Sequence, residues 1–101
     1  MIPTEKVLKR ALGLSIAGTR GGVLRLKILM ALKEKPRNTN EISKLFSIDY
    51  KTAQHHMRVL EKSGLVVSAG KRYDNSFMLS PLLGANKEIL EEVAGNLGKS
   101  G

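Results

Sequence analysis

Two helix signals separated by a three-residue turn constrain the fold of this chain most strongly. In the first, Asn38 is followed three positions later by Glu41, the spacing of a capping box at a helix start. The pattern predicts a short helix from about Thr39 to Phe46. Its inward-facing side chains are expected to be Ile42, Leu45 and Phe46.

The second signal begins after the turn Ser47-Ile48-Asp49. Asp49 is a favoured N-cap residue, and Gly64 suits the position just past a helix end because glycine adopts positive φ without strain. A longer helix is therefore predicted from Tyr50 to about Ser63. Two helices joined by so short a turn are typical of a helix-turn-helix unit.

The predicted helix at 50–63 separates its side chains into two faces. At about 100° per residue, four residues cluster on a core face. They are Ala53, His56, Met57 and Leu60. The opposite face holds Lys51, His55, Arg58 and Lys62, with Thr52 and Gln54 at its flanks. This outer face carries positive charge and hydrogen-bonding groups, although taken alone it also fits an ordinary solvated surface.

Two short strand signals follow the helix pair, at 65–67 and 76–79, with a polar, turn-rich segment between them. They predict a hairpin whose tip carries Lys71 and Arg72, either as a nucleic-acid contact or as a solubilising loop. Tyr73 beside them is expected to stack, to bind backbone or to pack under the hairpin. The predicted fold class is mostly α with a small β-hairpin: a winged helix-turn-helix with extra N- and C-terminal helices.

Further helices are predicted on both sides of this unit. The N-terminal one spans about 4–18 and carries on one face Val7, Leu8, Ala11, Leu12 and Leu14. The next runs to about Lys35, where Pro36 stops it. Its apolar residues form a core stripe of Leu24, Ile28, Ala31 and Leu32, and a second stripe of Val23, Leu26 and Met30. The last helix restarts at Ser80-Pro81 and carries on one face Leu82, Leu83, Ile89, Leu90, Val93 and Leu97.

We therefore expect one winged-helix DNA-binding domain over 1–101, with an N-terminal helix at 1–18, a core at 19–80 and a C-terminal helix at 81–101. The apolar stripes of the first, second and last helices supply a surface for a homodimer. The candidate dimerisation residues are Val7, Leu8, Leu12, Val23, Leu26, Met30, Ile89, Leu90, Val93 and Leu97.

Charge indicates the class of partner. The chain has 17 lysine and arginine residues against nine acidic ones, a net charge of +8. Such a balance favours polyanions, with nucleic acid as the first candidate and an anionic membrane surface as the second. No cysteine is present, which excludes disulfides, thiolate metal sites and cysteine nucleophiles. No apolar run approaches a membrane span, so a cytoplasmic, nucleoid-associated protein is expected.

These features together predict binding of double-stranded DNA. The major groove admits one α-helix, in which Arg58 suits guanine and Gln54 suits adenine. Lys51 and Lys62 are better placed for phosphates, and the hairpin tip for the minor groove. The candidate DNA-binding residues are Tyr50, Lys51, Thr52, Gln54, His55, Arg58, Lys62, Lys71 and Arg72.

The motifs resemble the ArsR-type winged helix over about residues 18–80. The resemblance is carried by Arg25-x-x-Ile28-Leu29-x-x-Leu32, by Asn38-x-x-Glu41-Ile42-x-x-Leu45, and by the run from Ile48 through His56-Met57 to Gly64-Leu65-Val66. The segments 18–22 and 49–52 are similar to archaeal members in particular. The resemblance implies a dimeric transcription regulator, with the helix at 50–63 as reader and the hairpin at 65–80 as wing.

The chain departs from the family's metal-sensing patterns, since it lacks cysteine and its last helix lacks histidine. No metal or cofactor is predicted, and an effector ligand is not identified. His55 and His56 are adjacent and point about 100° apart on a helix, so they cannot form a metal pair. We expect His56 to be a hydrogen-bonded packing residue and His55 to face solvent or DNA.

Two other segments have plain interpretations. The glycine-rich stretch 18–22 is expected to be a hinge or a close helix approach, with a DNA-backbone contact through Arg20 as the alternative. Glu88, Glu91 and Glu92 lie on a solvated helix face and do not form an acid/base pair, so an enzyme is not predicted. The competing functions are a weakly specific DNA-coating protein and a protein-interaction module. The operator, the regulated genes and activation versus repression are not encoded in any motif.

Overall fold

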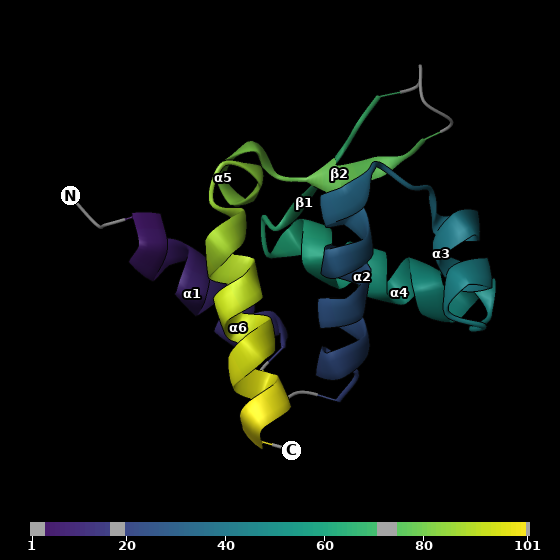
Figure 1. The fold of residues 1–101 in the computed structure, drawn as a ribbon. Helices are drawn as coiled ribbons and strands as arrows, with labels where there is room; N and C mark the ends of the chain where they lie inside the picture. Colours follow the sequence, from purple (N-terminus) through teal and green to yellow (C-terminus); the bar gives the residue numbers. More distant parts are fainter. Residues whose placement is uncertain (1–3, 17–19, 71–74, 101) are drawn as a thin grey trace.

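The computed structural model describes residues 4–16, 20–70 and 75–100, and in the last of these ranges it describes side chains as far as residue 96. The elements in these ranges are α1 (Thr4–Ser15), α2 (Gly22–Glu34), α3 (Thr39–Leu45), α4 (Tyr50–Lys62), β1 (Val66–Ser68), β2 (Phe77–Leu79), α5 (Pro81–Gly84) and α6 (Lys87–Ser100). The chain is mostly helical with one antiparallel hairpin, which confirms the winged helix-turn-helix fold (Figure 1).

Helix α2 stands at the centre of the fold, with α6 beside it and α4 crossing behind it (Figure 1). Helix α1 packs against α6, and α3 packs against α4. The helices bury a common apolar core. Its fully buried members include Leu12, Ile28, Leu29, Ile42, Met57, Leu60, Leu65, Leu83 and Leu90. This core holds the helix-turn-helix pair in a fixed position.

The caps predicted for the helix pair are confirmed. Asn38 Oδ1 accepts from the Glu41 N–H at 2.8 Å, and Glu41 Oε1 accepts from the Asn38 N–H at 3.0 Å. Asp49 Oδ1 accepts from the Thr52 N–H at 2.7 Å and so starts α4. At the other end of α4, Gly64 takes φ 75°. Main-chain groups that would otherwise be unpaired at these helix ends are therefore satisfied.

The inward direction predicted for Leu45 is wrong, since its side chain is 50% exposed. Ile42 is buried as expected, and Phe46 packs partly against the core. Ser43 is also buried, so the inner face of α3 is centred between Ile42 and Ser43. On that helical wheel Leu45 lies about 110° from the centre of the buried face.

The single apolar face predicted for the first helix is in fact two faces. Leu8 and Leu12 are buried, whereas Val7 is 41% and Leu14 is 72% exposed. The helix also ends at Ser15, earlier than predicted. Because Ser15 belongs to the buried face, that face is rotated away from Val7 and Leu14. In α2, Leu26 is buried with the core stripe and Val23 is 61% exposed.

The hairpin pairs Val66 with Leu79 and Ser68 with Phe77. A further bridge, which the sequence pattern did not predict, joins Arg37 to Phe77 through two main-chain hydrogen bonds of 3.1 and 2.8 Å. This bridge attaches the hairpin to the segment leading into α3. Lys71, Arg72 and Tyr73 lie outside the described residues.

The C-terminal helix predicted at 81–101 is divided into two. Ser80 Oγ accepts from the Leu83 N–H at 3.2 Å and Pro81 starts α5, as expected for this dipeptide. Helix α5 then ends at Gly84, and α6 starts at Lys87. The break changes the register of the apolar residues. Leu83, Ile89 and Leu90 are buried, whereas Leu82 is 43% exposed.

Candidate nucleic-acid interface

Helix α4 presents its charged side chains to solvent. Ala53, His56, Met57 and Leu60 are buried, and Lys51, His55, Arg58 and Lys62 are exposed. Gln54 and Thr52 are half-buried at the two edges of the outer face. The predicted division of this helix into a core face and a polar face is therefore confirmed.

No salt bridge joins the cations of α4 to a carboxylate within the described ranges, although the charge of Lys51 acts on nearby Asp49. Ion pairs there involve instead Lys9, Lys33 and Arg37. Lys51, Arg58 and Lys62 therefore keep their charge available for an external anion. A cationic helix face that is not neutralised internally attracts polyanions over a distance set by the ionic strength.

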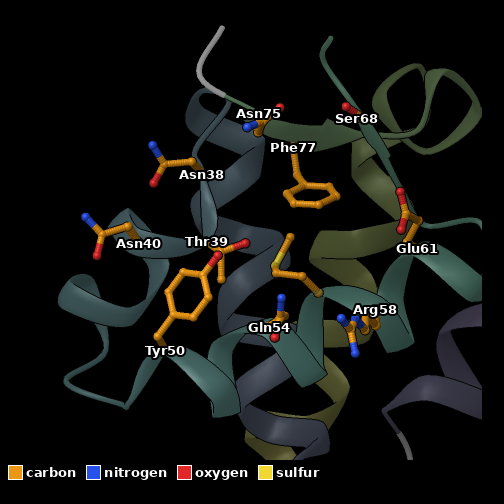
Figure 2. Close-up of a pocket in the computed structure, with 11 residues that line it drawn as sticks. Asn38, Thr39, Asn40, Tyr50, Gln54, Arg58, Glu61, Ser68, Asn75 and Phe77 are labelled. Carbon is orange, nitrogen blue, oxygen red and sulfur yellow. The ribbon is translucent and has the colours of Figure 1, made fainter. Parts of the chain in front are cut away.

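A groove of about 500 Å³ lies between this face and the hairpin. Its walls come from the start of α3, from one flank of α4 and from the strands, as Figure 2 shows. Tyr50, Gln54 and Arg58 line it from α4, and Phe77 extends toward α4 from β2. Among the predicted interface residues, these three from α4 are brought together at the groove. Lys51, Thr52, His55 and Lys62 lie outside it on the same helix.

Eight of the eleven residues that line the groove were not predicted to be part of the site, Asn38 and Glu61 among them. Asn38 lines it while also capping α3, and Glu61 contributes a carboxylate from the last turn of α4. Glu61 lies seven positions after Gln54, so helical periodicity places the two residues on the same flank. That spacing could have identified Glu61 from the sequence. The groove therefore combines amide, guanidinium, phenol and carboxylate groups.

His56 is buried beneath the outer face, as the sequence predicted. Its Nδ1 lies 3.1 Å from Arg25 Nη1, and its side chain is 7% exposed. Burial lowers the pKa of His56, and the charges of Arg25 and His55 lower it further. The glycine-rich stretch provides a close approach, since a Cβ on Gly21 would lie 2.7 Å from His56 Cε1. Arg20 is exposed, whereas Gly18 lies outside the described residues.

The predicted dimerisation residues differ in their exposure. Leu8, Leu12, Leu26, Ile89 and Leu90 are buried inside the monomer. Val7 and Val23 are exposed, Met30 and Val93 are half-buried, and the Leu97 side chain is not described. Val7 forms an apolar surface with Ala11 and Leu14, bordered by Lys6, Lys9 and Arg10.

The described residues hold neither a metal-binding cluster nor a membrane-spanning helix. They contain no cluster of three or more His, Cys, Asp or Glu side chains suited to a metal ion. No helix among them has the length and apolar character needed to cross a bilayer.

Residues 23–68 match the family model of the bacterial regulatory proteins of the arsR family. The match covers α2, α3, α4 and β1, which are the elements that build the helix-turn-helix and the first strand of the hairpin. It supports DNA-binding transcription regulation, and the family is one of regulators and not of enzymes. A comparison with curated protein sequences found no match.

Proposed function

We propose that this protein regulates transcription by binding double-stranded DNA with α4 in the major groove and the hairpin as a wing. The outer face of α4 supports the proposal most directly, because Lys51, Arg58 and Lys62 are exposed and make no ion pair within the described ranges. The major groove is about 12 Å wide and accommodates one α-helix.

Each side chain of the interface has a role that follows from its chemistry and position. Arg58 donates two hydrogen bonds to a guanine edge, and Gln54 pairs with an adenine edge. Lys51 and Lys62, near the two ends of α4, bind phosphates. The flanking contacts come from Tyr50, Thr52 and His55. Lys71 and Arg72, outside the described residues, reach the minor groove or its phosphates.

The groove beside α4 receives one strand of the DNA backbone in this arrangement. Its polar rim includes Asn38, Asn40 and Ser68, which carry hydrogen-bond donors for phosphate oxygens. The negative charge of Glu61 repels a phosphate at the same rim. Its carboxylate is, however, a good hydrogen-bond acceptor for the amino group of cytosine. We therefore expect Glu61 to lower affinity for non-specific DNA more than affinity for the operator.

A homodimer completes the proposal. The apolar surface of Val7, Ala11 and Leu14 on α1 provides contact area, and exposed Val23 at the start of α2 provides a further apolar side chain. A two-fold dimer would place two α4 helices in successive major grooves, about 34 Å apart, on an inverted-repeat operator. Binding at the nucleoid and likeness to archaeal members of the family belong to the same proposal. Sedimentation showing a monomer at micromolar concentration would contradict the dimer.

The test is a titration with the chain's own upstream DNA and with random duplex DNA at several salt concentrations. We expect the upstream DNA to bind at least about 10³-fold more tightly. Arg58→Ala should reduce the free energy of binding to the upstream DNA by about 1–3 kcal/mol and remove the preference for that DNA. Lys51→Ala should weaken binding to all sequences alike and lower the slope of log affinity against log salt by about one. Lys27→Ala, at an exposed position of α2, is the matched control.

Other results would assign other functions. Equal, steeply salt-dependent binding to every duplex would indicate a DNA-coating protein. An absence of binding near physiological salt would reject DNA recognition and favour a protein-interaction module. An Arg58→Ala variant with unchanged preference would reject α4 as the reading helix.

A further inference from the structure

A buried polar cluster connects the end of α1 to the proposed reading helix. We call it the Arg25 cluster, and its members are Ser15, Arg25, His56, Ser63 and the main chain of Arg20. Arg25 at its centre is 5% exposed. A buried guanidinium must be hydrogen-bonded on several sides to offset its loss of hydration.

The guanidinium of Arg25 joins three different segments. Its Nε donates to the Ser15 carbonyl at 2.7 Å, and its Nη2 donates to the Arg20 carbonyl at 3.2 Å. Its Nη1 lies 3.1 Å from Nδ1 of His56. Arginine has donors only, so His56 Nδ1 must accept and its proton must be on Nε2. The arrangement therefore requires a neutral imidazole.

A second link ties α1 to α4 near the end of the helix. Ser15 Oγ donates to Ser63 Oγ at 2.6 Å, and Ser63 Oγ donates to the Val59 carbonyl at 2.9 Å. Ser63 and His56 lie seven residues apart, about two helical turns. Ser15 thus reaches α4 at two separated points, directly at Ser63 and through Arg25 at His56. Two separated contacts restrain the direction of a core-packed helix more tightly than one contact does.

The main chain at Gly21 closes the cluster from the other side. Gly21 takes φ 80°, and a Cβ there would lie 2.7 Å from His56 Cε1 and 3.4 Å from Arg25 Nη1. Nothing larger than glycine fits without displacing the imidazole. The ring is therefore packed closely against the main chain at Gly21.

We propose that Arg25 is a positioning residue that sets the orientation of α4 relative to the end of α1, and that it does so only while His56 is uncharged. The proposal rests on the proposed function, because α4 is there the helix that reads DNA. Protonation of Nδ1 would remove the acceptor and put two cations in contact. The α4 helix would then keep its Ser63 link and lose its His56 link.

The charges around His56 agree with this dependence. Arg25 faces it from α2, and His55 lies on α4 with a ring-centre distance of 5.5 Å. The α1 side contributes the Ser15 hydroxyl and carbonyl, which are uncharged. Burial, Arg25 and His55 all lower the pKa of His56. Its neutral form is accordingly stable in the folded protein near neutral pH.

The neighbouring histidine must be separated from His56 in any DNA-binding test. His55 is exposed on the outer face of α4, where phosphates are expected. Operator binding by the wild type would therefore report on both histidines, so the test uses a His55→Gln variant.

The experiment measures operator affinity between about pH 4.5 and 8 for three proteins, because the lowered pKa of His56 places its protonation on the acid side of the ordinary histidine range. With His55→Gln, affinity should fall toward acid pH by up to about tenfold per pH unit, the limit for one proton. His56→Asn keeps an acceptor at the δ position and cannot be protonated, so its affinity should not fall in acid. Arg25→Lys should weaken operator binding about two- to thirty-fold at all pH values. A flat profile for His55→Gln would overturn the proposal.

Nuclear magnetic resonance of the wild type provides a readout that needs neither DNA nor a variant. As the His56 imidazole titrates, amide shifts should move along α4 as well as beside the ring. Shifts confined to the two residues next to His56 would overturn the proposal. If DNA binding is absent but the α4 amides respond, the proposed function fails and the positioning role survives. If DNA binds with no pH coupling through His56, the positioning role fails alone.

Discussion

Helices α4 and α6 are of similar length and both bury apolar residues, yet they use their charges in opposite ways. The cations of α4 are left without ion pairs in the described part of the chain, whereas Glu91 and Glu92 of α6 bind Lys33 of α2 and Lys9 of α1. In α6 the surface charges join helices of the same chain. Helix α4 is instead held in the fold by a main-chain cap and by the Arg25 cluster. Its outer face therefore stays free for another molecule.

The largest expected effect tests whether the two helices differ only on their outer faces. Leu60 of α4 and Leu90 of α6 are both fully buried. Leu60→Ala and Leu90→Ala should each lower the free energy of unfolding by about 2–5 kcal/mol, because each leaves a cavity in the core. Urea titration measures both. Leu14→Ala, at an exposed position, should change it by less than about 0.5 kcal/mol. A loss below about 1 kcal/mol for Leu90→Ala would show that α6 is not part of the common core.

The next effect separates backbone strain from steric contact around α4. Gly64 and Gly21 have φ of 75° and 80°, but a Cβ on Gly64 would meet nothing within 4 Å. Gly64→Ala should therefore cost only the left-handed backbone penalty, about 1–2 kcal/mol. Gly21→Ala should cost about 1–3 kcal/mol more, because its Cβ also displaces His56. Equal losses in thermal unfolding would contradict the tight packing between Gly21 and His56.

The smallest effects compare a capped helix start with an ion pair. Hydrogen bonds from the Thr52 side chain and N–H lower the pKa of Asp49, and a hydrogen bond from Lys33 and its charge lower that of Glu91. Both carboxylates contribute stability that is present above about pH 4.5 and is lost as the pH falls through their folded-state pKa values. Asp49→Ala and Glu91→Gln should each reduce that acid-side slope in unfolding measurements.

High salt distinguishes the effect of Asp49→Ala from that of Glu91→Gln. About 1 M NaCl should remove most of the effect of Glu91→Gln, since exposed ion pairs are screened. It should leave most of the effect of Asp49→Ala, because the lost cap is a short hydrogen bond to the main chain. Equal salt sensitivity would show that Asp49 acts mainly through its charge.

Local rules explain which parts of the fold were predictable. The capping box at Asn38, the cap at Asp49 and the two faces of α4 depend on residues within a few positions of one another, and all were predicted. The exposed position of Leu45 was not, because the buried face of a two-turn helix is decided by the helix packed against it. The break after Gly84 and the second face of α1 likewise depend on tertiary packing.

The candidate site shows the same division. The exposure of Lys51, His55, Arg58 and Lys62 followed from helical periodicity. Helical periodicity did not predict the burial of Arg25, because the three acceptors of its guanidinium come from segments as far as 31 positions away in the sequence. A charged residue between apolar neighbours in α2 was the signal for a buried polar cluster. Sequence alone gave no means of identifying its partners.

The bridge between Arg37 and Phe77 has a mechanical consequence. Both main-chain groups of Phe77 are bonded to Arg37, so β2 is anchored to the segment that leads directly into α3. Under the DNA-binding mode proposed above, a force that lifts the hairpin away from a bound duplex would therefore pull on the start of the helix pair. The hairpin and the helix pair should then leave the duplex together, in a single step without a stage in which only the hairpin is released.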